Sequence, residues 1–273
     1  MNARVAALLL LLLGIGCHRP TAPAPTVRRV VSLAPSSTEI LYALGAGALL
    51  VGVDQFSDWP PAAHALPRVG GELAPSVERI LALKPDLVLL ATSANTRQLG
   101  GELERLGVRV VLSRADRLDD VFADIARIGA AVGRATAAAA LVAGLRARLA
   151  AVAARVASAA RPKTLVVVWT DPLSVAGGHS FVDEAIVAAG GDDVAADSPQ
   201  PYPQYSVERL LARAPEVIVV GSRDGAPSLA PLEALALPAV RLRRLHRLDA
   251  DLLFRPGPRL VDGIEALSRI LHP

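Results

Sequence analysis

Aromatic side chains in predicted loops are the residues of this sequence best suited to bind a ligand. Only 3% of the 273 residues are aromatic, yet Phe56 and Trp59 share one Pro-rich loop, Trp169 ends a predicted strand, and Tyr202 and Tyr205 share another loop. Flat rings outside a core are typical of sites for planar or apolar molecules. Their grouping predicts a cleft that binds a large, partly planar ligand.

Two aromatic residues have an alternative role. Trp169 and Phe254 each follow aliphatic residues near a predicted strand end or turn, and such a ring can plug the base of a lobe instead of facing a ligand. For Phe254 both interpretations stay open.

The sequence contains no pattern typical of an enzyme or a metal centre. A Gly-x-Ser-x-Gly nucleophile elbow is absent, and the five histidines are scattered without the spacing of metal ligands. His64 and His179 lie in predicted loops, where contact with the metal of a bound macrocycle stays an alternative. We therefore expect a binding protein with no catalytic residue, no cofactor and no metal site of its own.

A duplicated segment predicts the framework that positions these residues. Residues 76–90 recur as 206–220, with seven of fifteen positions identical. In each copy a capping Ser precedes a short helix, a Pro ends it, and a buried aliphatic strand follows. Because the two copies are separated by the length of a domain, they predict two similar lobes with a cleft between them.

Each lobe is predicted to be an α/β unit. Strands alternate with helices, which favours a parallel sheet whose ligands bind beyond the carboxyl ends of the strands. We assign residues 28–133 to an N-terminal lobe and 161–273 to a C-terminal lobe. The Ala-rich residues 134–160 between them predict one rigid bridging helix, roughly 40 Å long at 1.5 Å per residue. Two surface helices joined at Gly133 are the alternative.

The first helix of the N-terminal lobe is predicted from a cap signal. Ser36 and Glu39 follow the first strand, 29–33, with the spacing of a capping box. The helix is therefore expected to begin there and to present its backbone N–H groups to polar or anionic ligand groups.

The N-terminal residues 1–17 are predicted to be a targeting segment. An apolar run, 5–15, follows Arg4 and is too short to span a bilayer, and the chain's single cysteine, Cys17, comes directly after it. The pattern is similar to a bacterial lipoprotein signal that lipidates Cys17, with Gly14 where that signal normally has Leu, and residues 18–27 would form a Pro-rich tether. An ordinary signal peptide with an incidental cysteine is the alternative. In both cases the protein is expected to work outside the cytoplasm, without a disulfide.

The charge pattern argues against nucleic acid as a partner. The 29 basic and 26 acidic residues give a net charge of +3, and the two kinds are interspersed. The short basic run 241–247 is interpreted as a solvated strand end and loop. We expect a monomer that does not bind nucleic acid.

Five segments together resemble a known family, the cobalamin-type substrate-binding proteins of ABC importers, which also includes ferric-siderophore and haem binders. The segments are 29–39, 56–60, 77–86, 202–206 and 255–259, and the similarity covers residues 28–270. The resemblance implies two Rossmann-like lobes joined by one long helix with the ligand between them. It also implies an extracytoplasmic lipoprotein that delivers cobalamin or a related corrinoid to its importer. A ferric siderophore or haem is the alternative ligand, and an extracytoplasmic enzyme is a more distant alternative.

The resemblance assigns site residues by position. Phe56 and Trp59 match an aromatic loop of the first lobe, and Tyr202 matches an aromatic residue of the second. Asp251 matches an acidic residue near the amide side chains of the corrinoid. Trp169 joins this ligand-binding set because it stands at the carboxyl end of a predicted strand.

Glu72 marks a departure from that family. The cobalamin binder used for the resemblance has Trp at this position. The substitution changes one wall of the implied site, so another corrinoid or a metal chelate is kept beside cobalamin.

The duplicated glutamates Glu78 and Glu208 match the pair that, in the family, docks each lobe onto basic residues of the membrane permease, which works with its ATPase. An acid in the first turn of a helix is also favoured by the helix dipole. Both interpretations can hold at once.

Overall fold

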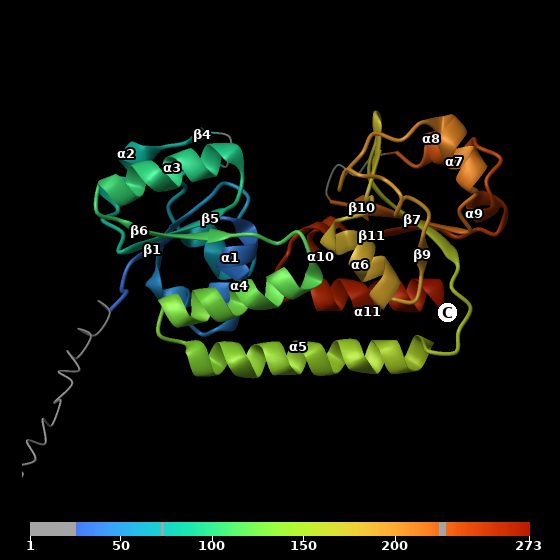
Figure 1. Cartoon of the computed structure of the whole chain (residues 1–273). Coiled ribbons are helices and arrows are strands. Elements are labelled where there is room, and N and C mark those ends of the chain that lie inside the picture. Colours follow the sequence, from blue (N-terminus) through green and yellow to red (C-terminus); the bar gives the residue numbers. More distant parts are fainter. Residues whose placement is uncertain (1–25, 72–73, 224–227) are drawn as a thin grey trace, which may run out of the picture.

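The computed structural model describes residues 26–71, 74–223 and 228–273. Two α/β lobes lie side by side, and one long helix, α5, runs along both of them (Figure 1). The predicted fold, with two lobes of mainly parallel strands, is confirmed. Cys17, Glu72 and the predicted leader lie outside the described residues.

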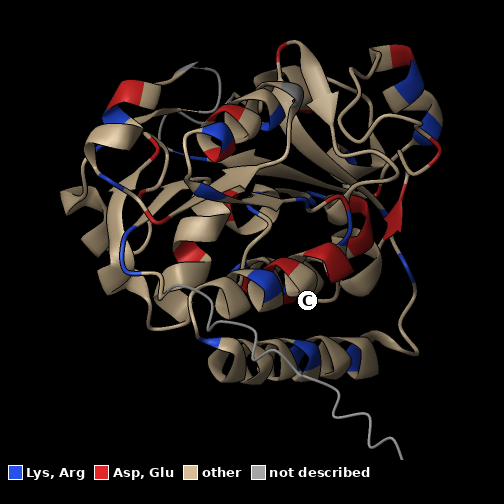
Figure 2. Cartoon of the chain, turned by 60° about the vertical axis from the view of Figure 1, so that its left-hand side comes forward, with Lys and Arg blue, Asp and Glu red and all other residues tan. Residues whose placement is uncertain are grey.

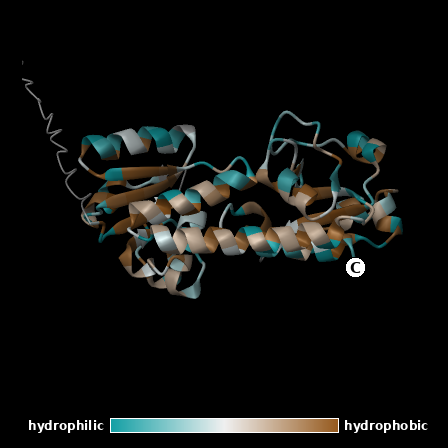
Figure 3. Cartoon of the chain, turned by 60° about the horizontal axis from the view of Figure 1, so that its bottom comes forward, coloured by the Kyte–Doolittle hydropathy of each residue, from teal (hydrophilic) through white to brown (hydrophobic). Residues whose placement is uncertain are grey.

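The N-terminal lobe is built on a four-stranded parallel sheet in the order β2-β1-β5-β6. Its strands are aliphatic and largely buried because helices cover both faces, which is typical of parallel sheets. Figure 3 shows the strands of both lobes among the most hydrophobic segments. The elements of this lobe are β1 (Val30–Leu33), α1 (Pro35–Ala43), η1 (Gly47–Leu49), β2 (Leu50–Val53), η2 (Pro61–Ala65), β3 (Gly70–Gly71), β4 (Ala74–Pro75), α2 (Val77–Ala82), β5 (Leu87–Ala91), α3 (Ala94–Arg105), β6 (Arg109–Ser113) and α4 (Leu118–Ala131).

The C-terminal lobe has a five-stranded sheet in the order β11-β10-β7-β8, with β9 also paired to β7. The pairs β11-β10, β10-β7 and β7-β9 are parallel, whereas β8 runs antiparallel to β7. Its elements are β7 (Lys163–Thr170), β8 (Leu173–Val175), α6 (Phe181–Ala188), β9 (Asp192–Asp193), α7 (Val207–Arg213), β10 (Val217–Ser222), α8 (Ala230–Glu233), α9 (Pro238–Arg241), β11 (Leu245–Asp249), α10 (Ala250–Phe254) and α11 (Leu260–Leu271).

The duplicated segments occupy equivalent places in the two lobes. Helix α2 leads into β5, which pairs with β1 in the N-terminal lobe. Helix α7 leads into β10, which pairs with β7 in the C-terminal lobe. Ser76 and Ser206 cap the two helices by accepting a hydrogen bond from the backbone N–H three residues later, at 3.2 and 3.1 Å. The predicted helix-break-strand unit is thus present in both copies.

Helix α5 (Ala135–Val156) bridges the lobes, and it begins after Gly133, whose φ is +71°. It packs against α4 of the first lobe and α11 of the second. Arg148 donates to Asp262 at 2.5 Å and to Glu265 at 2.8 Å, and Figure 2 shows arginines of α5 beside acidic residues of α11. With 22 residues the helix is roughly 33 Å long, shorter than expected because residues 157–162 form a non-helical connection.

Length and composition alone would also let α5 cross a membrane, since its mean hydropathy is 1.6. Its buried side chains, however, are a stripe facing the two lobes: Ala138, Leu145, Val152 and Val156. The helix therefore packs on the lobes along this stripe, whereas most of its other residues are exposed.

The lobes also touch at the start of α4. The Leu118 N–H donates to Oε2 of Glu184 on α6 at 2.7 Å, and Arg117 lies 2.7 Å from the other oxygen of the same carboxylate. Glu184 therefore ties the first turn of a helix in one lobe to the other lobe.

The predicted start of the first helix is wrong. Helix α1 begins at Pro35, Ala34 is its N-cap, and no side chain caps it. Pro suits the first helical position because its fixed φ and missing N–H cost nothing there. Ser36 and Glu39 are buried instead of capping. The Glu39 carboxylate forms ion pairs with Arg255 and Arg259 of the C-terminal lobe.

Two buried carboxyl groups predict how stability depends on pH. Burial raises the pKa of Asp193 to about 7 and that of Asp124 to about 6. Between pH 4 and 7 the folded protein therefore binds more protons than the unfolded chain. Its free energy of unfolding should fall as pH rises through this range, by up to about 1.4 kcal/mol per pH unit for each group.

Urea unfolding at several pH values between 5 and 8 measures this slope. In the Asp193→Asn variant the side chain no longer titrates, so the slope should flatten near pH 7 while the Asp124 contribution remains. A wild-type free energy of unfolding that stays constant over this range would contradict the prediction.

Candidate ligand-binding site

A pocket of about 680 Å³ lies between the lobes. The first lobe contributes Asp58, and the second contributes residues at or just after the carboxyl ends of β10 and β11. This is the end of a parallel sheet where ligands normally bind. Its lining residues are Asp58, Ser222, Arg223, Arg247, Leu248, Asp249 and Asp251.

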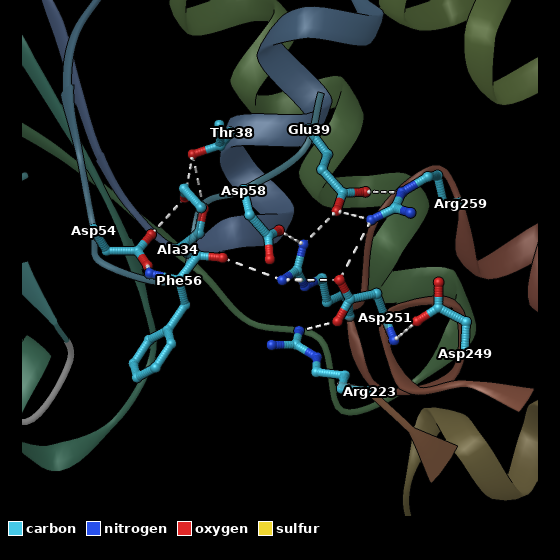
Figure 4. A network of polar contacts seen from close by, with 12 residues as sticks. Ala34, Thr38, Glu39, Asp54, Phe56, Asp58, Arg223, Asp249, Asp251 and Arg259 are labelled. Carbon is cyan, nitrogen blue, oxygen red and sulfur yellow. Dashed lines mark hydrogen bonds and ion pairs between the residues drawn. The ribbon is translucent and has the colours of Figure 1, made fainter. Parts of the chain in front are cut away.

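One buried guanidinium joins the two lobes at this pocket. Arg255, which is only 6% exposed, donates to Asp58 at 2.6 Å and to Glu39 at 3.1 Å. It also donates to the backbone oxygen of Phe56 at 3.1 Å and lies 3.0 Å from the Asp251 carboxylate (Figure 4). Arg255 thereby joins the loop that carries Phe56 and Asp58 in the first lobe to Asp251 in the second.

Arg259 completes the connection from the same segment. Its guanidinium makes a two-pronged contact with Glu39, at 2.9 and 2.6 Å, and lies 4.6 Å from the centre of the Trp59 ring. Trp59 itself lines a different pocket of about 320 Å³, together with Tyr42 and Pro258. The structure therefore places Trp59 against Arg259 and not among the residues that line the larger pocket.

Phe56 is held on a loop with its own buried polar core. Asp54 accepts hydrogen bonds from the Phe56 N–H and from the Ser57 hydroxyl, both at 2.6 Å. Thr38 contacts the Ser57 hydroxyl at 2.8 Å, and Arg68 donates to the backbone oxygens of Asp54 and Ser57. The loop backbone is fixed, while the Phe56 ring remains 52% exposed and available to a ligand.

The aromatic residues predicted from the second lobe are exposed as well. Trp169, at the end of β7, is 51% exposed and donates its ring N–H to the backbone oxygen of Asp171 at 2.7 Å. Tyr202 is 42% exposed. Neither ring is among the residues that line the pocket around Asp251, so their contact with a ligand stays a prediction.

The phenol of Tyr202 is influenced by a carboxylate of the other lobe, Asp116. The Tyr202 ring is 42% exposed, yet the pKa of its phenol is raised to about 12. The main cause is desolvation by the surrounding protein, and the second is the negative charge of Asp116. The phenol stays neutral at physiological pH and can donate a hydrogen bond.

Two other aromatic residues belong to the core. Tyr205 is buried in the hydrophobic cluster of the second lobe. Phe254 packs against the main core beside Gly221, where a Cβ would lie 2.2 Å from its ring. For Phe254 the structure therefore favours the role of a plug.

Five charged residues at or beside the pocket were not predicted as site residues from the sequence: Glu39, Asp58, Arg223, Arg255 and Arg259. Four of them lie in segments that carried the family resemblance: Glu39 in 29–39, Asp58 in 56–60, and Arg255 and Arg259 in 255–259. Charged side chains in short Pro-rich loops were the available signal. Their pairing spans about 200 positions, so periodicity along the sequence does not reveal it.

The two duplicated glutamates lie on exposed first turns of α2 and α7. Both helices are on the side of the molecule opposite α5, one in each lobe (Figure 1). Hydrogen bonds from its own backbone N–H and from Ser206 lower the pKa of Glu208, which keeps this side chain ionised. Glu78 and Glu208 thus present two carboxylates on one side of the two-lobed body.

No group of three His, Cys, Asp or Glu side chains suited to a metal ion occurs in the part of the chain that the structure describes. His64 and His179 are exposed, and neither is a lining residue of the pocket between the lobes.

Comparison with known proteins identifies relatives over nearly the whole chain. A family model described as "Periplasmic binding protein" matches residues 30–252. The vitamin B12-binding protein of Yersinia pseudotuberculosis is 33% identical over 269 residues, which cover 97% of this chain and 92% of that protein.

Two solved structures share the fold and about a third of the sequence. The periplasmic vitamin B12 binding protein BtuF of Vibrio cholerae has a TM-score of 0.79 and 31% identity, over 90% of this chain and 96% of that one. The periplasmic heme-binding protein RhuT from Roseiflexus sp. RS-1 has the same TM-score and identity, over 90% and 98%. The fold is therefore equally similar to binders of two different macrocycles.

Proposed function

The chain belongs to the periplasmic binding protein family, whose members are binding proteins, and from this premise we propose that it delivers cobalamin or a related corrinoid to an ABC importer. The observation that carries the proposal is the 33% identity to a vitamin B12-binding protein over 97% of the chain. The ligand is bound between the lobes, with no chemical step.

The chemistry of the pocket supports this ligand class. Its lining contains both acceptors, such as Asp58 and Asp251, and donors, such as Arg223. The edge of a corrinoid carries primary amides, which donate and accept together and so match such a lining. The exposed rings of Phe56 and Tyr202 offer flat apolar surface to the macrocycle, at about 0.5–1.5 kcal/mol per aromatic contact beyond area burial.

Haem is the second candidate, because a heme-binding protein is as similar in fold and identity as a B12 binder. A ferric siderophore remains the third ligand class implied by the family resemblance.

We further propose that the protein works at the periplasmic face of a membrane, anchored through lipidated Cys17. In this arrangement Glu78 and Glu208 dock the two lobes onto the permease of the importer.

Titration of the purified protein distinguishes the ligands. We expect cyanocobalamin to quench the fluorescence of Trp169 or Trp59 with a saturable, stoichiometric response, and haem and ferric siderophores to bind more weakly. Tight binding of haem or of a siderophore, with no response to corrinoids, would overturn the proposal. Mass spectrometry of whatever co-purifies with residues 18–273 gives an independent answer.

A further inference from the structure

Arg223 comes directly after strand β10, and its side chain helps to line the pocket between the lobes. This side chain is 46% exposed. Among the described residues, its ion-pair partner is Asp251 (Figure 4). A guanidinium has five N–H donors in a rigid fork. One carboxylate does not use all of them, so donors remain for a ligand.

Asp251 orients this arginine through their ion pair. Its carboxylate is mostly buried and is itself fixed by Arg255 at 3.0 Å. Arg223 is therefore oriented by a carboxylate that is itself fixed in the protein. This reduces the conformational entropy that the Arg223 side chain loses when a ligand binds.

The acids that share the pocket are already engaged by the protein. Asp58 accepts from Arg255 at 2.6 Å, and Asp249 accepts from the Asp251 backbone N–H at 2.9 Å. Arg247 also lines the pocket, so two guanidinium groups face it. Burial, and secondly the positive charge of Arg255, lower the pKa of Arg223. The negative charge of a bound group would offset both effects, because it favours the charged guanidinium.

We propose that Arg223 binds an anionic oxygen group of the ligand and thereby selects macrocycles that carry such a group beside an apolar face. This inference rests on the proposed function and deepens it. The group is a phosphodiester or a carboxylate: cobalamin carries the first on its nucleotide loop, and haem carries the second on its propionates.

Two matched pairs of probes test the assignment in the full-length protein. Cyanocobalamin carries the phosphodiester and dicyanocobinamide lacks it, while hemin carries two carboxylates that its dimethyl ester lacks. The affinity of Arg223→Gln for the anionic member of the pair that wild type binds should fall about 10- to 100-fold, with less than a threefold change for the neutral member. Arg223→Lys should lose less, because it keeps the charge but not the fork.

Arg213→Gln is the matched control, since Arg213 is a similarly exposed arginine paired with a carboxylate, Asp197, but does not line the pocket. It should leave all four affinities unchanged. Equal losses for both members of a pair in Arg223→Gln, or no loss for either, would overturn the role of Arg223 while leaving the proposed function intact. Failure of the wild-type protein to bind any of the four probes would overturn both.

Discussion

Replacing both Glu78 and Glu208 with Lys is expected to abolish transport while leaving ligand binding unchanged. Both carboxylates are exposed and belong to equivalent helices of the two lobes, α2 and α7, which are on the side opposite α5. An exposed acid that meets arginine on a partner steers encounter and fixes orientation. Two such points, one on each lobe, would set how the cleft lies over the permease. The measurements are ligand uptake and ATPase stimulation by the importer reconstituted in vesicles.

Single reversals should give partial losses, because one carboxylate remains in each. The matched control reverses Glu102 and Glu104, two exposed acids of α3, which changes net charge by the same amount without altering the duplicated helices. Normal transport by the Glu78→Lys/Glu208→Lys protein would mean that helix-dipole stabilisation alone accounts for these glutamates.

The architecture was predictable because it depends on local patterns that repeat. The segments 76–90 and 206–220 each carry a cap, a break and an aliphatic strand within fifteen residues, and these signals depend on neighbours in sequence. The structure has both units, at Ser76 and Ser206, in equivalent positions. The Ala-rich stretch after Gly133 was likewise sufficient to predict the bridging helix.

The buried charged cluster beside the pocket was not predictable in the same way. Ser36 and Glu39 match a capping box, yet tertiary pairing with Arg255 and Arg259 decides what Glu39 does. A buried carboxylate gains more from two guanidinium groups than a helix start gains from a cap. The orientation of the Trp59 ring was also not predictable from the sequence. Its loop was correctly predicted to be irregular, but the ring packs against Arg259, which is 200 positions away in the chain.

The substitution Arg255→Met is expected to have the largest effect on stability. It keeps most of the side-chain volume but removes the guanidinium that contacts Glu39, Asp58, Asp251 and the Phe56 oxygen. Removing one partner of a buried ion pair leaves the other charges poorly compensated, which typically costs about 3–5 kcal/mol. Glu39 keeps Arg259 as a partner, so we expect the lower end of this range in urea unfolding.

Arg148→Met is the matched control for this variant. Arg148 also contacts two carboxylates, Asp262 and Glu265, but it is 40% exposed, so solvent screening should limit its loss to about 1 kcal/mol or less. Arg255→Met should in addition weaken ligand binding, because the Phe56 loop and Asp251 lose the group that fixes them relative to each other, whereas Arg148→Met should not. Equal and small stability losses in the two variants, with unchanged affinity in both, would show that Arg255 does not hold the lobes in their binding geometry.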